Sequence, residues 1–163
     1  MGLKFDNRFA TLPECFYTKM NPEVVSTKPE LVHINSSLAE TLGLEISNKE
    51  ELAYCFAGNK LFKDSEPLAM VYSGHQFGYW AGQLGDGRAL LLGQVLNKKQ
   101  KLLDIQLKGA GQTPYSRMGD GRAVMRSSIR EYLCSEAMHA LQIPTSRALC
   151  LVKTNQTVYR EMP

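Results

Sequence analysis

The chain has 163 residues and a formal net charge of +3, with 44% hydrophobic and 21% charged residues. These values are ordinary for a soluble globular protein, and the length suffices for one domain with a substantial core. The charge is too small for a nucleic-acid-binding tail, and no hydrophobic run approaches the roughly 18–20 residues of a membrane-spanning helix. We therefore expect no nucleic-acid partner, no membrane partner and a cytoplasmic location.

The N-terminal stretch MGLKFDNRFATLPECF lacks the apolar core of a signal peptide and the composition of a transit peptide. The four cysteines and three histidines are scattered along the chain, and none of them has the spacing of a metal site. Cysteines of cytosolic proteins are usually reduced, so we expect free, buried thiols and no zinc site.

Residues 1–35 contain scattered aromatic residues, several prolines and weak periodicity, which predict an irregular arm draped on the domain. The segment NSSLAETLGL then predicts a short helix, with Ser36 or Ser37 as its N-cap and Gly43 near its end.

A second helix is predicted over about residues 48–57, because Ser47 and Glu50 have the spacing of a capping box. It is expected to end near Gly58. The composition then changes to YSGHQFGYWAGQLGDGR, in which glycines are interleaved with aromatic residues. This stretch predicts a glycine-rich loop.

The pentapeptide GDGRA occurs twice, at residues 85–89 and 119–123. Glycines let backbone N–H groups approach an anion closely, and a neighbouring Arg adds a planar donor fork suited to phosphate. The first copy supplies Gly85, Gly87 and Arg88. Its pattern G-x-x-G-x-G reverses the familiar G-x-G-x-x-G, so no nucleotide-binding fingerprint matches literally. A tight turn between strands is the alternative interpretation.

After the first copy, ALLLGQVL and KLLDIQL flank the polar turn NKKQ, which predicts an antiparallel hairpin. Along the second strand Leu103, Ile105 and Leu107 alternate with polar residues, so they should line one face of the strand. Lys108 ends this strand on the opposite, polar face, across one hairpin from the first GDGRA copy.

The second glycine-rich loop, GAGQTPYSRMGDGRA, precedes VMRSSIREYLCSEAMHALQ, the strongest predicted helix of the chain. Its apolar residues Ile129, Leu133, Ala137 and Ala140 fall on one helical face. The dipeptide Ile143-Pro144 should end it, because a residue before proline avoids the helical conformation.

The segments RALCLVKT and TVYRE, around the turn at residues 154–156, predict a second hairpin. The chain ends with Met162-Pro163 directly after this strand-like run, so we expect it to be a fragment of a larger protein. The order of the predicted elements indicates a mixed α+β fold with mainly antiparallel strand pairing.

Lys108 gives the two loops a chemical context. Protein kinases place a Lys after a glycine-rich loop, in V-A-I-K, and pair it with a Glu on the next helix. Ile105-Gln-Leu-Lys108 has the same spacing, and the next helix contains Glu131 and Glu136. On a helical wheel Glu136 falls within the apolar stripe, which slightly favours it as the inward-facing partner. A solvated surface charge is the alternative for Lys108.

Three segments, YSGHQFGYWAGQLGDGRALLLGQV, QLKGAGQTPYSRMGDGRAVMRSSIREYLCSEAMHAL and IPTSRAL, together resemble the N-terminal part of the selenoprotein O family. The resemblance covers most of residues 70–150 and is fainter upstream. It implies a protein-kinase-like N-lobe over residues 67–163, with a mainly antiparallel sheet and a long αC-like helix. Residues 1–66 would form an N-terminal extension with short helices.

The same resemblance implies a protein adenylyltransferase, which moves AMP from ATP to Ser, Thr or Tyr hydroxyls of other proteins. Some bacterial members of the family are described as transferring UMP from UTP. The family's ion-pair glutamate corresponds to Glu131, in disagreement with the helical wheel. The family's nucleotide-binding residues correspond to Gly85, Gly87, Arg88, Lys108, Asp120 and Gly121.

The resemblance further implies Mg²⁺, whose Asn and Asp ligands the family places beyond residue 163, together with the catalytic Asp and two phosphate-contacting arginines. We therefore expect no catalytic or metal-binding residue in these 163 residues and no transfer activity from them alone. A non-catalytic ATP-binding or interaction module is the alternative to an enzyme. The modest charge disfavours a nucleic-acid binder.

Overall fold

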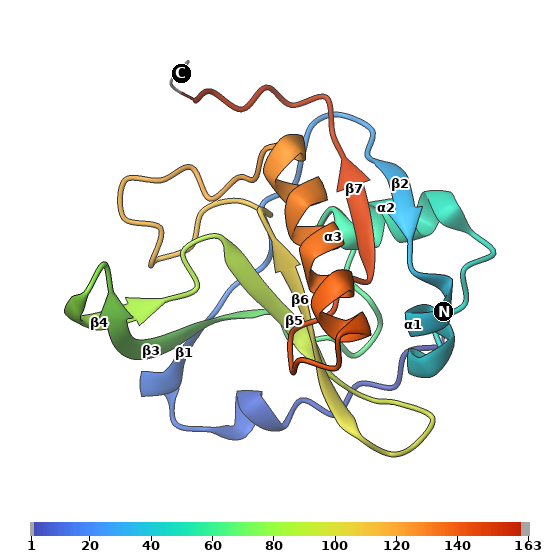
Figure 1. The fold of residues 1–163 in the computed structure, drawn as a ribbon, viewed down its shortest axis with the longest axis horizontal. Coiled ribbons are helices and arrows are strands. Elements are labelled where there is room, and N and C mark those ends of the chain that lie inside the picture. The colour runs from blue at the N-terminus through green and yellow to red at the C-terminus, as the bar shows by residue number, and fades with distance from the viewer. Residues whose placement is uncertain (1, 161–163) are drawn as a thin grey trace.

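Five antiparallel strands form the main sheet of the computed structural model, which describes residues 2–160 (Figure 1). The strands follow the order β1-β3-β5-β6, and β4 pairs with β3. The predicted α+β class and the hairpin of β5 with β6 are confirmed. Their bounds are Tyr17–Lys19 (β1), Leu68–Gln76 (β3), Tyr79–Gly85 (β4), Ala89–Leu96 (β5) and Leu102–Lys108 (β6).

A second, two-stranded sheet pairs β2 (Glu30–Ile34) with β7 (Cys150–Lys153). The hairpin predicted around residues 154–156 is therefore wrong, since β7 pairs with β2 and residues 157–160 form no strand; residue 161 lies outside the described residues. The prediction of an irregular arm over residues 1–35 is also wrong in part, because β1 and β2 each join a sheet. Both partners lie far away along the chain, where no local pattern could indicate them.

The two N-terminal helices form where predicted, but asparagines cap them instead of serines. α1 (Ser36–Leu42) begins after Asn35, whose side chain accepts a hydrogen bond from the Leu38 amide at 3.0 Å. α2 (Lys49–Phe56) begins after Asn48, whose side chain accepts a hydrogen bond from the Glu51 amide at 3.1 Å. Asn is at least as good an N-cap as Ser, so the cap lies one position before Ser36 in α1 and one position after Ser47 in α2. Gly43 ends α1 in the left-handed conformation, as predicted.

The main hydrophobic core joins α1 and α2 to one face of β5 and β6. It fixes β6, whose opposite face carries Lys108. Its buried residues come from both sides of the predicted boundary at residue 66, and that division stays a prediction. The core consists of Ala39, Leu42, Leu44, Leu52, Cys55, Phe62, Leu92, Val95, Ile105 and Leu107.

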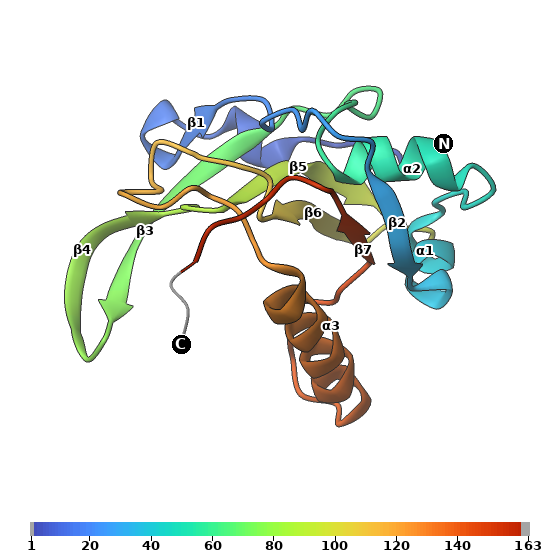
Figure 2. The same ribbon diagram turned by 90° about the horizontal axis from the view of Figure 1, so that it is seen from above.

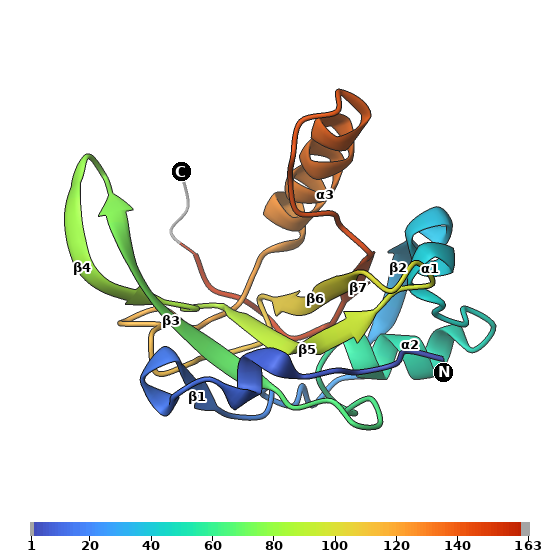
Figure 3. The same cartoon turned by 90° about the horizontal axis from the view of Figure 1, so that it is seen from below.

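β3 and β4 form a long hairpin that extends away from the core (Figures 2 and 3). It contains most of the glycine- and aromatic-rich stretch, so the predicted glycine-rich loop is wrong there. Its two-residue turn, Phe77-Gly78, has φ angles of 54° and 84°, as tight hairpins require. Phenylalanine is uncommon at such a position, and the sequence therefore carried no usual hairpin signal.

α3 (Met125–Ala140) is confirmed as a long helix, but it stands apart from the main sheet (Figure 2). None of its residues is buried, and Ile129 and Leu133 are 41% and 64% exposed. The predicted apolar stripe thus faces solvent, which removes the reason for regarding Glu136 as the inward-facing glutamate. Within residues 2–160, no helix is long and apolar enough to cross a membrane.

Candidate functional site

Both copies of GDGRA lie beside the end of β6. The amide of Gly109 donates to the carbonyl of Arg88 at 2.6 Å, which places the first copy on one side of residues 108–111. On the other side, Ala110 forms a β-bridge with Arg122 of the second copy. The strand that carries Lys108 therefore ends between the two loops.

Lys108 forms an ion pair with Glu131, the glutamate that the family resemblance indicates. Its Nζ donates to Glu131 Oε1 at 2.6 Å, and the two side chains are 47% and 52% exposed. Glu136 has other partners, since it accepts two hydrogen bonds from Arg147, at 2.7 and 2.6 Å, and one from Asn35. The Arg147 guanidinium lowers the pKa of Glu136. Glu136 therefore ties α3 to its neighbours, and Glu131 reaches the candidate site.

In the first GDGRA copy, the carbonyls of Asp86 and Gly87 are bonded, whereas the amides of Gly87 and Arg88 are free within the described residues. The hydroxyls of Thr113 and Ser116 donate to the carbonyls of Asp86 and Gly87. In the described part of the chain, the amides of Gly87 and Arg88 have no acceptor, and the exposed Arg88 guanidinium has no ion-pair partner. Free amides next to a guanidinium are the donor arrangement that binds an anion.

Close packing also requires glycine at both positions of the first copy. A Cβ on Gly85 would lie 2.5 Å from the ring of Tyr115, and a Cβ on Gly87 would lie 2.9 Å from the Tyr115 carbonyl oxygen. The Tyr115 hydroxyl shares a 2.7 Å hydrogen bond with Thr18. The two glycines are thus fully explained by loop-against-loop contact, and the groups of this loop suited to hold a ligand are the free amides and the Arg88 side chain.

Asp86 of the first copy is a buried structural carboxylate, only 4% exposed. It accepts hydrogen bonds from the Met70 amide at 3.1 Å and from the Gln106 side chain at 3.3 Å. Burial nevertheless raises the pKa of Asp86, because these bonds only partly replace the lost hydration. Asp86 joins β3, β6 and the first loop.

The Asp86→Asn variant should change the pH dependence of stability. A raised folded-state pKa means that Asp86 contributes stability below its unfolded-state pKa of about 3.9 and loses it as pH rises through the folded-state pKa. Asn cannot titrate but can still accept from Met70. Urea unfolding measured between about pH 3.5 and 7 should show the variant gaining stability relative to the wild type as pH rises. A constant or falling difference would contradict this account.

The second GDGRA copy uses its aspartate differently. Asp120 is exposed, and its two oxygens accept hydrogen bonds from the Arg160 guanidinium at 2.7 and 2.9 Å and from the Arg122 amide at 2.9 Å. Arg160 lowers the pKa of Asp120. The Arg122 side chain is buried, and its Nη2 lies 3.1 Å from Glu23 Oε1 without the geometry of a hydrogen bond.

A cavity of about 300 Å³ opens where β6, the second loop, α3 and the segment after β7 meet. Its size is within the range of small-molecule sites. Three cations line it, Lys108, Arg122 and Lys153. Its other lining residues are Val25, Phe56, Ala57, Leu107, Gly109, Ala110, Ala123, Val124, Met125, Ser128, Val152, Thr154, Gln156 and Val158.

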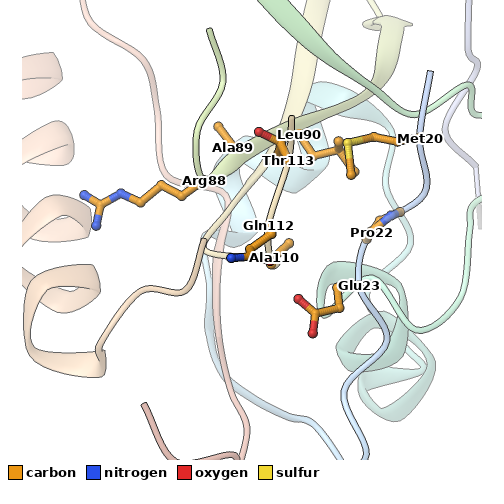
Figure 4. Close-up of a pocket in the computed structure, with 10 residues that line it drawn as sticks. Met20, Pro22, Glu23, Arg88, Ala89, Leu90, Ala110, Gln112 and Thr113 are labelled. Carbon is orange, nitrogen blue, oxygen red and sulfur yellow. The ribbon is translucent and has the colours of Figure 1, made fainter. Parts of the chain in front are cut away.

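A second cavity lies between the first loop and the N-terminal segment, beside Met20, Glu23 and Gln112. Its volume is about 10 Å³, which is room for one water molecule at most. Figure 4 shows the Arg88 side chain pointing away from Met20 and Glu23. Arg88 therefore presents its charge outside this small cavity.

The model of the family described as protein adenylyltransferase SelO matches residues 1–163. The chain belongs to the SelO family. It is 59% identical over 159 residues to the protein nucleotidyltransferase YdiU of Dechloromonas aromatica (strain RCB), covering 96% of this chain and 32% of that protein. The protein of the same name from Ectopseudomonas mendocina (strain ymp) is 56% identical over 161 residues, covering 98% and 33%. The chain thus spans about a third of the length of these SelO relatives.

Two residues of the site were not predicted for this SelO chain. Arg160 lies in TVYRE, whose pattern indicates a strand, and its bond to Asp120 joins residues far apart in the chain. Tyr115 lies between the two GDGRA copies and packs on the first. The segment GAGQTPYSRMGDGRA was interpreted only through its glycines. Its one aromatic residue, Tyr115, was the signal that could have indicated this packing contact.

Proposed function

We propose that this chain is the nucleotide-binding part of a protein adenylyltransferase that moves AMP from ATP to Ser, Thr or Tyr hydroxyls of other proteins. In this proposal residues 67–163 form a protein-kinase-like N-lobe and residues 1–66 its extension. The observation that carries the proposal is the Lys108–Glu131 ion pair, 2.6 Å long, at the end of a strand flanked by both GDGRA copies. Family membership supports a nucleotide as the ligand.

The free amides of Gly87 and Arg88 and the Arg88 guanidinium would bind phosphate oxygens of ATP. Lys108 would supply a further positive charge, and Glu131 would orient its ammonium group. Asp120 and Gly121 belong to the same proposed site through the second loop, which adjoins residues 108–111.

In the transfer, the hydroxyl oxygen of the acceptor forms a bond to the α-phosphorus of ATP. The bond from that phosphorus to the bridging oxygen breaks, pyrophosphate leaves, and the hydroxyl proton passes to a base that the family resemblance places outside these residues. Fixed positive charges stabilise the negative charge that develops on the phosphates. Within residues 2–160 no group of three or more His, Cys, Asp or Glu side chains is placed to hold a metal ion.

The proposal is tested by incubating the intact protein with acceptor proteins and ATP labelled at either the α- or the γ-phosphate. Label from the α-position should enter protein with release of pyrophosphate, and label from the γ-position should not. Transfer of the γ-label would mean a kinase and would overturn the proposal. Binding of ATP without any transfer would mean a non-catalytic module, and transfer from UTP alone would replace AMP by UMP.

A further inference from the structure

Both carboxylate oxygens of Asp120 accept hydrogen bonds within the protein. Oδ2 accepts from Arg160 Nη1 at 2.7 Å, whereas Oδ1 accepts from Arg160 Nη2 at 2.9 Å and from the Arg122 amide at 2.9 Å. Such a bidentate guanidinium–carboxylate pair is among the strongest side-chain contacts in proteins. Most of the accepting capacity of this carboxylate, three of about four lone-pair sites, is therefore used within the protein.

The guanidinium of Arg160 is almost saturated as well. It carries five N–H donors. Nη1 also donates to the Tyr159 carbonyl at 2.6 Å, and Nη2 also donates to the Arg122 carbonyl at 2.9 Å. Four donors are therefore used within the protein. Arg160 is thus a clamp between two segments, with too few donors left to act as a phosphate ligand.

The clamp anchors a segment that forms one wall of the 300 Å³ cavity. This segment, after β7, contributes Thr154, Gln156 and Val158 to the lining, which also includes Lys108. The only other hydrogen bond that attaches residues 154–160 to the remaining described chain is from the Asn155 amide to Thr27 Oγ1, at 3.1 Å. Removing Arg160 would therefore loosen this segment, and it would remove one of the contacts of the second GDGRA loop, which keeps its bridge to Ala110.

The clamp also holds the buried cation of the cavity. Arg122 donates its amide to Asp120 and accepts from Arg160 at its carbonyl, so its backbone is bonded on both sides. Arg122 is only 9% exposed and lines the cavity together with Lys108. Arg160 is thus one of the contacts that position Arg122, beside its bridge to Ala110 and its ion pair with Glu23.

We infer that Arg160 is a positioning residue for nucleotide binding, and that Asp120 acts on the nucleotide through Arg160 and not by contact. This inference rests on the proposed function, which includes Asp120 in the nucleotide site. It assigns residues 154–160 to the site, and none of the nucleotide-binding residues that the family resemblance implies lies in this segment.

A double-mutant cycle in the intact protein tests the inference. Asp120→Asn and Arg160→Gln should each raise the Kd for a non-hydrolysable ATP analogue about tenfold, which corresponds to about 1.4 kcal/mol. Because both remove the same clamp, the double variant should also bind about tenfold more weakly. If the double variant instead binds about a hundredfold more weakly, the two effects multiply. Asp120 would then contact the nucleotide independently, which would overturn the inference.

Hydrogen exchange without nucleotide separates this inference from the proposed function. Arg160→Gln should speed exchange at residues 119–123 and 154–160, with the unfolding temperature otherwise retained, and Arg160→Lys should give an intermediate effect. Arg8→Gln breaks a comparable arginine–aspartate pair on the surface, to Asp6, and should change neither segment. Unchanged exchange in both Arg160 variants would refute the clamp, whereas a wild-type protein that binds no nucleotide would refute the proposed function alone. If Arg160→Gln does not fold, Arg160→Lys decides by the same criteria.

Discussion

Lys108→Ala in the intact protein is expected to lower nucleotidyl transfer from ATP by about a hundredfold or more, with little loss of stability. Removing one preorganised group that stabilises transition-state charge typically has this effect on rate. The ammonium group of Lys108 is half exposed and bonds only to Glu131 in the described residues. Such surface ion pairs contribute about 0–1 kcal/mol, so the variant should fold normally. Rates of α-phosphate transfer and thermal unfolding curves measure the two effects.

Two further variants give the controls for Lys108. Lys28→Ala breaks an exposed ion pair of the same 2.6 Å length, to Glu50, and should leave transfer unchanged. Glu131→Gln should lower transfer less than Lys108→Ala, since it removes only the orienting charge. Transfer by Lys108→Ala within about twofold of the wild type, or an equal loss in Lys28→Ala, would refute the role of Lys108.

The Gly121→Ala variant is expected to lose roughly 3 kcal/mol or more of stability. Gly121 has a φ of 65°, and an added Cβ would overlap the backbone carbonyl of Gly111. The two segments could separate only by breaking the bridge between Ala110 and Arg122. The second loop would therefore move away from Lys108. Urea unfolding followed by circular dichroism measures the loss.

Gly82→Ala is the matched control for Gly121, because its φ is 66° and an added Cβ would meet nothing within 4 Å. It should lose only the cost of the left-handed backbone, roughly 1–2 kcal/mol. Equal losses in the two variants would show that backbone conformation alone explains the glycine, and that close contact between the loops does not matter.

Local patterns sufficed for the elements whose partners lie nearby in the chain. The alternation of Leu103, Ile105 and Leu107 predicted both the hairpin and the exposed face that carries Lys108. The helices near residues 36 and 49 were also found, although their asparagine caps were not. Capping and alternation depend on contacts within a few residues, which the sequence shows directly.

Long-range partners were beyond the reach of these patterns. Nothing near β7 indicates that it pairs with β2 instead of residues 157–160. The apolar stripe through Ile129 and Leu133 predicted a buried face, because amphipathic helices usually bury their apolar side. In the described residues that face is exposed, and the helical wheel consequently favoured the wrong glutamate.

The two GDGRA copies show how far identical residues can differ in role. The family resemblance implies nucleotide-binding residues in both copies, and both copies adjoin the end of β6. Asp86 is buried against Met70 and Gln106, whereas Asp120 is exposed and holds Arg160. The first copy lies between two strands and the second lies in a loop before a helix. These surroundings, and not the identical pentapeptide, determine the role of each aspartate.

The exposure of the Lys108–Glu131 pair limits the fraction of molecules in which the pair is closed. A pair worth at most about 1 kcal/mol is open in at least roughly a tenth of the molecules at any moment. A phosphate that approaches Lys108 therefore meets an ammonium group that already alternates between two arrangements. The closed and open arrangements of the pair therefore differ little in free energy. A small free-energy change at either residue, or a small displacement of α3, is enough to make the open arrangement the more populated one.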